Sequence, residues 1–150
     1  MPDFDLVIIG TGSGNSILTP EFEGWNVAIV ERGVFGGTCL NAGCIPSKML
    51  VLPADRMVEA AEATARLDVD IEARGADWPE LRDRVFGRID PIAEGGTRYR
   101  HSQDHVTVFH GDGRFVGDHR LAVTASDGTV TELTAPQFVL AAGARPRIPD

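Results

Sequence analysis

Two short apolar runs separated by a glycine-rich turn constrain the fold of this chain more than any other feature. Residues 4–9 and 27–30 are rich in β-branched side chains, as is typical of strands buried on both faces of a parallel sheet. A Gly-Thr-Gly-Ser-Gly turn at residues 10–14 follows the first run, and a helix-compatible segment leads on to the second. The order strand, glycine turn, helix, strand predicts a Rossmann-like α/β domain built on a parallel sheet.

The glycine turn and the acid after the second run together predict a dinucleotide site. Glu31 follows Gly10 by 21 residues, close to the spacing of the dinucleotide-binding fingerprint. Gly10 permits a tight turn, Gly12 lets the backbone approach a diphosphate, and the helix start offers free N–H groups to the phosphates. The Glu31 carboxylate would accept hydrogen bonds from ribose hydroxyls, and its charge would repel a 2′-phosphate. An ordinary βαβ turn without a ligand is the alternative interpretation.

The fingerprint departs from its usual form at the third glycine. Asn15 stands at that position, directly after Gly14, and asparagine is small enough for the helix to pack closely on the strand. Pro20 and Gly24 follow, so the helix is expected to be short.

The two cysteines of the chain and its single lysine lie close together in the sequence, as Cys39, Cys44 and Lys48. A Cys-x4-Cys pair can form a reversible disulfide if the backbone turns back on itself, and Gly43 supplies the flexibility for that turn. Pro46 suits the first turn of a helix, and a thiol at a helix N-terminus has a lowered pKa and is a better nucleophile. The segment therefore predicts a redox-active pair of thiols.

The two cysteines have three other interpretations. A structural disulfide is rare in a chain without a secretory signal. A zinc site needs a second pair of ligands, and no histidine forms a companion motif, so no metal site is predicted. Buried, inert thiols are the third alternative. The histidines considered as ligands are His101, His105, His110 and His119.

The rest of the chain divides into a helical part and a strand part. Residues 45–67 predict a helix in which Pro53 could introduce a kink, and Asp77 is the expected N-cap of a second helix. That second helix should run through Ile89, and Pro91 and two consecutive glycines are expected to interrupt it before Tyr99. Short strands with a hairpin signal at residues 127–128 predict a small antiparallel β-meander followed by one more buried strand. The expected strands are 106–109, 114–116, 121–124, 129–132 and 138–143.

Length, charge and hydropathy exclude several classes of protein. A chain of 150 residues is long enough for one domain with a real core. The formal net charge of -8 argues against nucleic acid as a partner, because phosphate binding needs a basic surface. No apolar run is long enough to span a membrane, and the N-terminal residues lack the features of a secretory signal. We therefore expect a cytoplasmic protein without a membrane partner.

The motifs resemble those at the N-terminal end of the flavoprotein disulfide reductases, also called the pyridine nucleotide-disulfide oxidoreductases. The matching elements are the glycine turn, Glu31, the Gly-Gly-Thr-Cys-x4-Cys-x-Pro-Ser-Lys stretch at residues 36–48, and the Ala-Ala-Gly at residues 141–143. They occur in the family's order along nearly the whole chain. Within the family, residues 10–16 and 85–93 are most similar to the mycothione reductases.

The resemblance implies FAD as the bound cofactor and a two-electron relay. Reduced nicotinamide (NADPH, or NADH) would reduce the flavin, and the flavin would reduce a Cys39–Cys44 disulfide. By analogy Cys44 lies nearer the flavin, Cys39 exchanges with the substrate disulfide, and Lys48 places a positive charge near flavin N5. The implied FAD contacts are Gly10, Gly12, Ser13, Gly14, Asn15, Glu31, Arg32, Gly37, Thr38, Cys39, Cys44, Lys48, Gly113, Ala141, Ala142 and Gly143.

The family also uses parts that this sequence does not contain. A nicotinamide-binding domain and a C-terminal interface domain with a His–Glu pair normally follow, and the active parent is expected to be a homodimer. We therefore expect residues 1–150 to be the N-terminal portion of an FAD-binding domain, inactive by itself. Alternatives left open are a dihydrolipoamide dehydrogenase-like or other member of the family, a non-catalytic FAD-binding fragment, and an NAD-binding Rossmann module with incidental cysteines. The expected substrate is a low-molecular-weight disulfide, with mycothione favoured.

Overall fold

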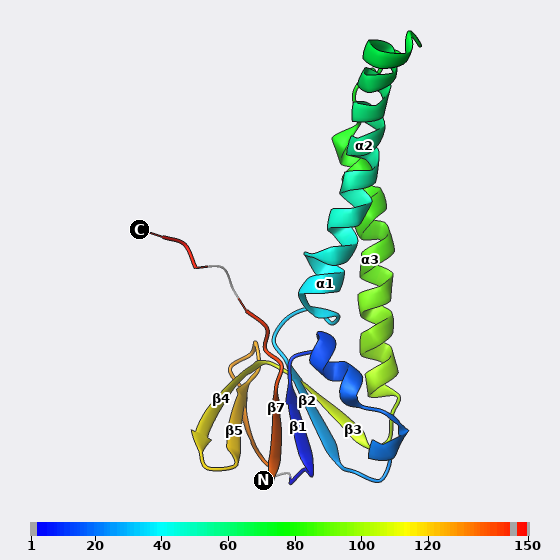
Figure 1. The fold of residues 1–150 in the computed structure, drawn as a ribbon. Coiled ribbons are helices and arrows are strands. Elements are labelled where there is room, and N and C mark those ends of the chain that lie inside the picture. Colours follow the sequence, from blue (N-terminus) through cyan, green and yellow to red (C-terminus); the bar gives the residue numbers. More distant parts are fainter. Residues whose placement is uncertain (1–2, 145–146, 150) are drawn as a thin grey trace.

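The computed structural model describes residues 3–144 and 147–149 and has two parts, a sheet domain and a long helical hairpin (Figure 1). The hairpin rises from one end of the sheet domain and extends well beyond it. The elements relevant to function lie where the two parts meet.

The centre of the sheet domain is a parallel sheet of four strands in the order β3-β2-β1-β7. The two apolar runs of the sequence form β1 and β2, which pair in register from Leu6 opposite Val27 to Ile9 opposite Val30. The Rossmann-like α/β fold expected from the glycine turn is therefore confirmed. The strands are β1 (Leu6–Ile9), β2 (Val27–Glu31), β3 (Val106–His110) and β7 (Gln137–Leu140).

The antiparallel meander expected in the second half of the chain forms a separate three-stranded sheet. Its strands are β4 (Asp112–Gly117), β5 (Arg120–Thr124) and β6 (Val130–Thr134), in that order. Leu121, Val123 and Leu133 pack together with residues of the central strands, including Val7 and Val30, to form one buried cluster. The meander thus covers one face of the parallel sheet. Gly113, one of the implied FAD contacts, lies within β4.

The opposite face of the parallel sheet carries a second buried cluster. Leu6, Ile8 and Ile29 contribute to it, and Phe35 covers them from the segment after β2. Apolar side chains from the segment between β1 and β2 pack against the same cluster. This segment therefore covers the face of the sheet where an α-helix was expected. These side chains are Leu18, Phe22 and Trp25.

The segment between β1 and β2 is where the sequence prediction fails. We expected a short α-helix after the glycine turn, but the structure has two 3₁₀ helices, η1 (Ser13–Ile17) and η2 (Pro20–Phe22). The chain leaves η1 at once, since the Thr19 N–H bonds to the Ile17 carbonyl at 2.8 Å. Pro20 lacks the N–H needed to continue an α-helix. The glycine turn is therefore followed by two short 3₁₀ helices rather than by an α-helix of several turns.

Three α-helices complete the chain: α1 (Gly37–Asn41), α2 (Cys44–Leu67) and α3 (Trp78–His101). Asp77 caps α3 as expected, its carboxylate accepting from the Glu80 N–H at 3.0 Å. The expectation that Pro91 interrupts α3 is wrong, since the helix continues to His101. Val85, Ile89 and Ala93 lie on both sides of Pro91 at helical spacing and are all buried, so tertiary packing outweighs the local cost of the proline. The short helix α1 was not expected at all.

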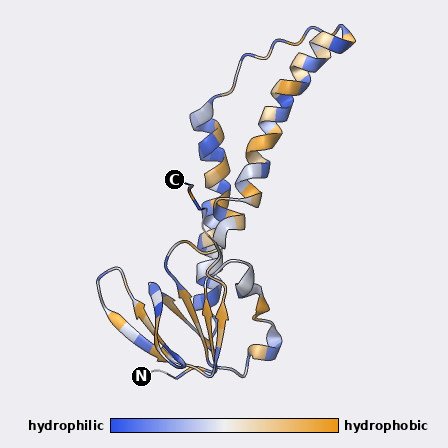
Figure 2. Ribbon diagram, turned by 60° about the vertical axis from the view of Figure 1, so that its left-hand side comes forward, coloured by the Kyte–Doolittle hydropathy of each residue, from blue (hydrophilic) through white to orange (hydrophobic). Residues whose placement is uncertain are grey.

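Hydropathy follows the same division (Figure 2). Apolar residues dominate the central strands, whereas the helical hairpin mixes apolar and polar residues along its length. Among the described helices, none combines the length and the apolar composition needed to cross a bilayer.

Gly14 gives a stability test of the packing between the glycine turn and the strand at its side. A Cβ added at Gly14 would lie 2.2 Å from the Ala141 Cβ. We expect Gly14→Ala to lower the free energy of unfolding in urea by about 1–3 kcal/mol, as overpacking does. The double variant Gly14→Ala/Ala141→Gly should recover most of this loss.

A matched control is Gly87→Ala in the middle of α3. An added Cβ meets nothing within 4 Å there. This substitution should stabilise the protein by up to about 1 kcal/mol, because alanine is the better helix former. Equal effects of the two substitutions would contradict the close contact at Gly14.

Candidate active site

A cavity of about 920 Å³ opens at the carboxyl ends of β1, β2 and β7. Ligands of open α/β sheets bind at this end of the strands, and the volume falls within the range of about 300–1,000 Å³ usual for small-molecule sites. The cavity brings together most of the residues singled out in the sequence. They are Gly10, Gly12, Ser13, Gly14, Glu31, Arg32, Gly37, Thr38, Cys39, Cys44, Gly113, Ala141, Ala142 and Gly143.

Two glycine-rich segments form the floor of the cavity and touch each other. Gly37 has a φ of +60°, and a Cβ there would lie 2.6 Å from the Gly12 Cα. Gly10 has a φ of +106°, and a Cβ there would lie 2.3 Å from the Ala141 carbonyl oxygen. Only glycine fits these positions, because both the dihedral angle and the space exclude a side chain. The Gly36 N–H also bonds to the Thr11 carbonyl at 3.2 Å, which ties the two segments together.

The close packing expected of Asn15 is provided by its neighbour. Gly14 lies against Ala141, so the small residue required beside the strand is residue 14. Asn15 does not line the cavity, and its side-chain Oδ1 is buried without a hydrogen-bond partner among the described residues. Sequence spacing alone could not separate these two neighbouring positions.

Glu31 fixes the shape of the glycine turn. One carboxylate oxygen accepts from both the N–H and the hydroxyl of Thr11, at 2.9 and 2.6 Å, and the other accepts from the Gly33 N–H at 2.8 Å. A carboxylate oxygen has two lone pairs, so the oxygen bonded to Gly33 can still accept one hydrogen bond from a ligand hydroxyl, whereas the oxygen bonded twice to Thr11 has both lone pairs in use. Thr11 is buried and was missed by the sequence analysis, because the variable position of a Gly-x-Gly turn carries no signal of its own.

The geometry of the turn fits the diphosphate of a dinucleotide. The hydrogen bonds of the described residues use the N–H of Thr11 and of Asn15 but not those of Gly12 or Ser13. Both of the latter residues line the cavity. Unpaired N–H groups at a glycine turn bind phosphate oxygens.

The two cysteines lie on different helices that meet at the edge of the cavity. Cys39 belongs to α1, and Cys44 is the first residue of α2. Gly43 between them approaches α1 so closely that a Cβ would lie 2.9 Å from the Thr38 carbonyl oxygen. Both cysteines are free and exposed in this structure. Hydrogen bonding with the Cys44 thiol, together with desolvation, raises the pKa of the Cys39 thiol above its usual value.

Two charged residues that the sequence predicts for the site, Arg32 and Lys48, differ in their position relative to the cavity. Lys48 does not line the cavity; its side chain is exposed one helical turn after Cys44. Arg32 lines the cavity and lies 3.8 Å from the Asp112 carboxylate in an exposed ion pair. The structure therefore places Arg32 at the wall of the cavity and leaves Lys48 outside it.

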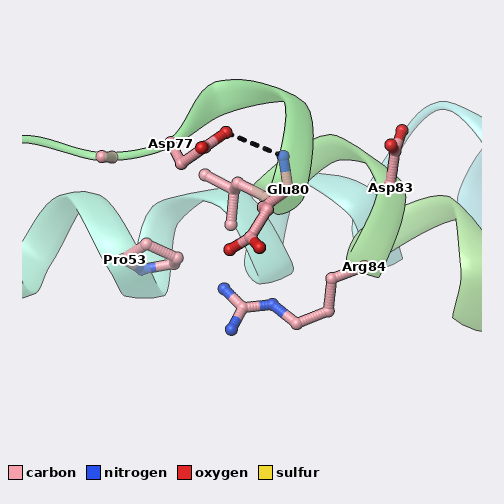
Figure 3. A pocket seen from close by; sticks show the side chains of 7 residues that line it. Pro53, Asp77, Glu80, Asp83 and Arg84 are labelled. Atoms are coloured by element: carbon pink, nitrogen blue, oxygen red, sulfur yellow. Dashed lines mark hydrogen bonds between the residues drawn. The ribbon is translucent and has the colours of Figure 1, made fainter.

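A second hollow of about 530 Å³ lies far from the cysteines, between Pro53 of α2 and the first turns of α3 (Figure 3). Its walls are the cap residue Asp77, two further acids and Arg84. No nucleophile or cysteine reaches it, and none of the predicted site residues borders it.

The bond from Thr11 to Glu31 predicts the effect of a substitution at Thr11. Thr11→Val keeps the shape of the side chain but removes the hydroxyl donor to a carboxylate, so the protein should lose about 1–2 kcal/mol of unfolding free energy. Urea unfolding measures this. Thr107→Val, at an exposed position of β3, should change stability little, and an equal loss in both variants would contradict a specific role of Thr11.

The raised pKa of Cys39 predicts its alkylation behaviour. In a Cys44→Ala variant the hydrogen bond is lost, so Cys39 should ionise at lower pH and react with iodoacetamide at lower pH than in the wild type. Trypsin releases both cysteines in one peptide, residues 33–48, and fragment-ion spectra separate the two positions. A Cys39 pH profile that Cys44→Ala leaves unchanged would contradict the contact between the two sulfurs.

Comparison with known proteins agrees with this arrangement. The family model described as pyridine nucleotide-disulphide oxidoreductase matches residues 4–150. Mycothione reductase of Mycobacterium tuberculosis (strain CDC 1551 / Oshkosh) is 43% identical over 152 residues, which covers 99% of this chain and 32% of that protein. Soluble pyridine nucleotide transhydrogenase of Enterobacter sp. (strain 638) is 32% identical over 154 residues, with 99% and 32% covered.

A solved structure shows the same fold. It is the Cu(II) complex of the HOCl-induced flavoprotein disulfide reductase RclA from Escherichia coli, with a TM-score of 0.76 and 25% identity over 99% of this chain and 30% of that one. The chain thus spans about a third of the length of the relatives it matches. On these grounds the chain belongs to the pyridine nucleotide-disulphide oxidoreductase family.

Proposed function

We propose that the protein containing this chain is an FAD-dependent reductase of a low-molecular-weight disulfide, and that residues 1–150 are the N-terminal portion of its FAD-binding domain. One observation carries the proposal: a single cavity is lined by a dinucleotide-type glycine turn and by both cysteines of the chain. A nucleotide module with incidental cysteines would not need the two features to share a wall.

The residues around the cavity fit FAD. Gly12 and Ser13 offer unpaired N–H groups for a diphosphate, and the Glu31 oxygen bonded to Gly33 can accept from a ribose hydroxyl. The Glu31 charge disfavours a 2′-phosphate, so NADPH is not expected in this cavity. When bound, FAD supplies two-electron transfer between reduced nicotinamide and a disulfide.

The dithiol can complete the reduction with atoms and electrons in balance. A thiolate attacks one sulfur of the substrate disulfide, forming a mixed disulfide and releasing the first thiol. The second cysteine then attacks the mixed disulfide, releasing the second thiol and leaving a Cys39–Cys44 disulfide. We assign the first attack to Cys39 and the second to Cys44, as in the family that the chain resembles.

The Cys39 pKa bears on this assignment. Hydrogen bonding with Cys44 raises the pKa of the Cys39 thiol, which lowers the fraction of reactive thiolate. A nearby base is therefore required, and the acid–base pair that the family carries in its C-terminal domain would meet this need. Lys48 is exposed one helical turn after Cys44 and does not line the cavity.

We favour mycothione as the substrate and NADPH or NADH as the electron donor. The support for mycothione is the 43% identity to a mycothione reductase along 99% of the chain. We further propose that the active protein is a cytoplasmic homodimer, as the resemblance to the family implies.

The test is a steady-state assay of the full-length protein with bound FAD. NADPH and NADH oxidation should be measured with mycothione disulfide, glutathione disulfide and lipoamide, with the highest kcat/KM expected for mycothione disulfide. Cys39→Ser and Cys44→Ser should each lower turnover by more than about a hundredfold, because the nucleophile or the resolving thiol is lost. The visible absorbance of both variants should show full FAD content.

Other outcomes of the same assay would contradict the proposal. Turnover that persists in both serine variants would exclude dithiol chemistry. Electron transfer from one nicotinamide to the other without a disulfide, unaffected by either substitution, would favour a transhydrogenase. The same assay on residues 1–150 alone tests the expectation that this portion is inactive by itself.

A further inference from the structure

Arg100 is a buried cation that the proposed chemistry leaves unexplained. It lies in the last turn of α3, and only 7% of its surface is exposed. Arginine is rarely buried unless a carboxylate pairs with it. None of the ion pairs among the described residues includes Arg100, so its charge is buried without a neutralising partner.

The guanidinium of Arg100 is instead held by neutral groups. One nitrogen donates to the Asn15 carbonyl at 2.8 Å, and the other donates to the Gln103 side-chain oxygen at 2.7 Å. The Tyr99 ring lies 5.2 Å from the guanidinium carbon. Burial lowers the pKa of Arg100, yet an arginine remains protonated near neutral pH. The positive charge is therefore retained and is directed at residue 15.

Asn15 is the position at which a longer helix would need a donor. In an α-helix the carbonyl of residue 15 would accept from the N–H of residue 19. Here the Thr19 N–H bonds to the Ile17 carbonyl, because the helical segment stops after η1. Arg100, from a segment 85 residues further along the chain, supplies the missing hydrogen bond.

Arg100 also replaces the positive partial charge that a longer helix would place at its N-terminus. In the usual fingerprint, the aligned peptides of a long helix place a positive partial charge behind the phosphates. Five residues of 3₁₀ helix supply few aligned peptides. Arg100 donates a hydrogen bond to the carbonyl of Asn15, and Gly14, the residue before Asn15, lines the cavity. In a chain with a formal net charge of -8, a buried cation at this place favours an anionic ligand.

We propose that Arg100 is a positioning residue for the diphosphate of the dinucleotide. It holds the glycine turn through the Asn15 carbonyl and supplies the positive charge that the shortened helix does not. The proposal rests on the dinucleotide site described above. Arg100 does not line the cavity and is not assigned any contact with the ligand itself.

The test compares ligands with and without a diphosphate. The purified protein that contains this chain is freed of ligand, and its affinity for FAD and ADP is measured by calorimetry and for adenosine by NMR titration. Arg100→Gln should weaken FAD and ADP about tenfold, in the range of one charged hydrogen bond, and leave adenosine unchanged. Arg100→Lys, which keeps the charge, should recover part of the loss.

The matched control is Arg98→Gln. Arg98 lies on the same helix, and its substitution makes the same change in net charge, but its side chain is exposed and pairs with Glu94 at 3.5 Å. It should leave all three affinities unchanged. An Arg100→Gln protein that binds ADP as the wild type does, or that loses ADP and adenosine equally, would overturn the proposal.

Two further outcomes keep the proposals separate. If the wild type binds ADP with the expected dependence on Arg100 but does not bind FAD, the proposed function fails and the role of Arg100 stands. If Arg100→Gln does not fold, Gln103→Leu removes the acceptor of Arg100 and keeps the arginine. That variant should weaken ADP about threefold and leave adenosine unchanged, within the usual value of a neutral hydrogen bond. An unchanged ADP affinity in it would then overturn the inference.

Discussion

The contact between two glycine segments is the constraint on which the whole site depends. Gly12 of the first turn and Gly37 at the start of α1 meet with no room for a side chain between them, and the Gly36 N–H bonds to the Thr11 carbonyl beside them. The glycine turn and the two cysteines can line one cavity because the backbones of these two segments approach this closely. A side chain on Gly37 would force the two backbones apart, because its Cβ would lie 2.6 Å from the Gly12 Cα.

The sequence predicted the parts of the fold that depend on local pattern. The apolar runs of β1 and β2 can be buried on both faces only as central parallel strands, and they occupy that place. The meander followed from short alternating strands with an Asp-Gly turn. Most of the expected residues line the cavity because the carboxyl ends of parallel strands meet at one edge of a sheet.

The parts that the sequence did not predict depend on contacts between distant segments. α3 continues past Pro91 because Ile89 and Ala93 are buried on the same helical stripe, which no local propensity reveals. The helix after the glycine turn is replaced by η1 and η2, and the donor it would have provided comes from Arg100. Thr11 was missed because its role lies in a hydrogen bond to Glu31, which is 20 residues away along the chain.

The two cysteines show how the fold joins a rigid support to a reactive surface. The turn beneath them is fixed by Glu31, Gly37 and the packing of Gly14, all of which restrict the backbone. Both cysteines nevertheless lie exposed, in the middle of α1 and at the start of α2. Disulfide exchange needs both properties, since the thiols must stay close to a fixed cofactor site and still be reached by a substrate from solvent. Placing them on two short-linked helices, with Gly43 packed against Thr38, keeps the sulfurs together without burying either one.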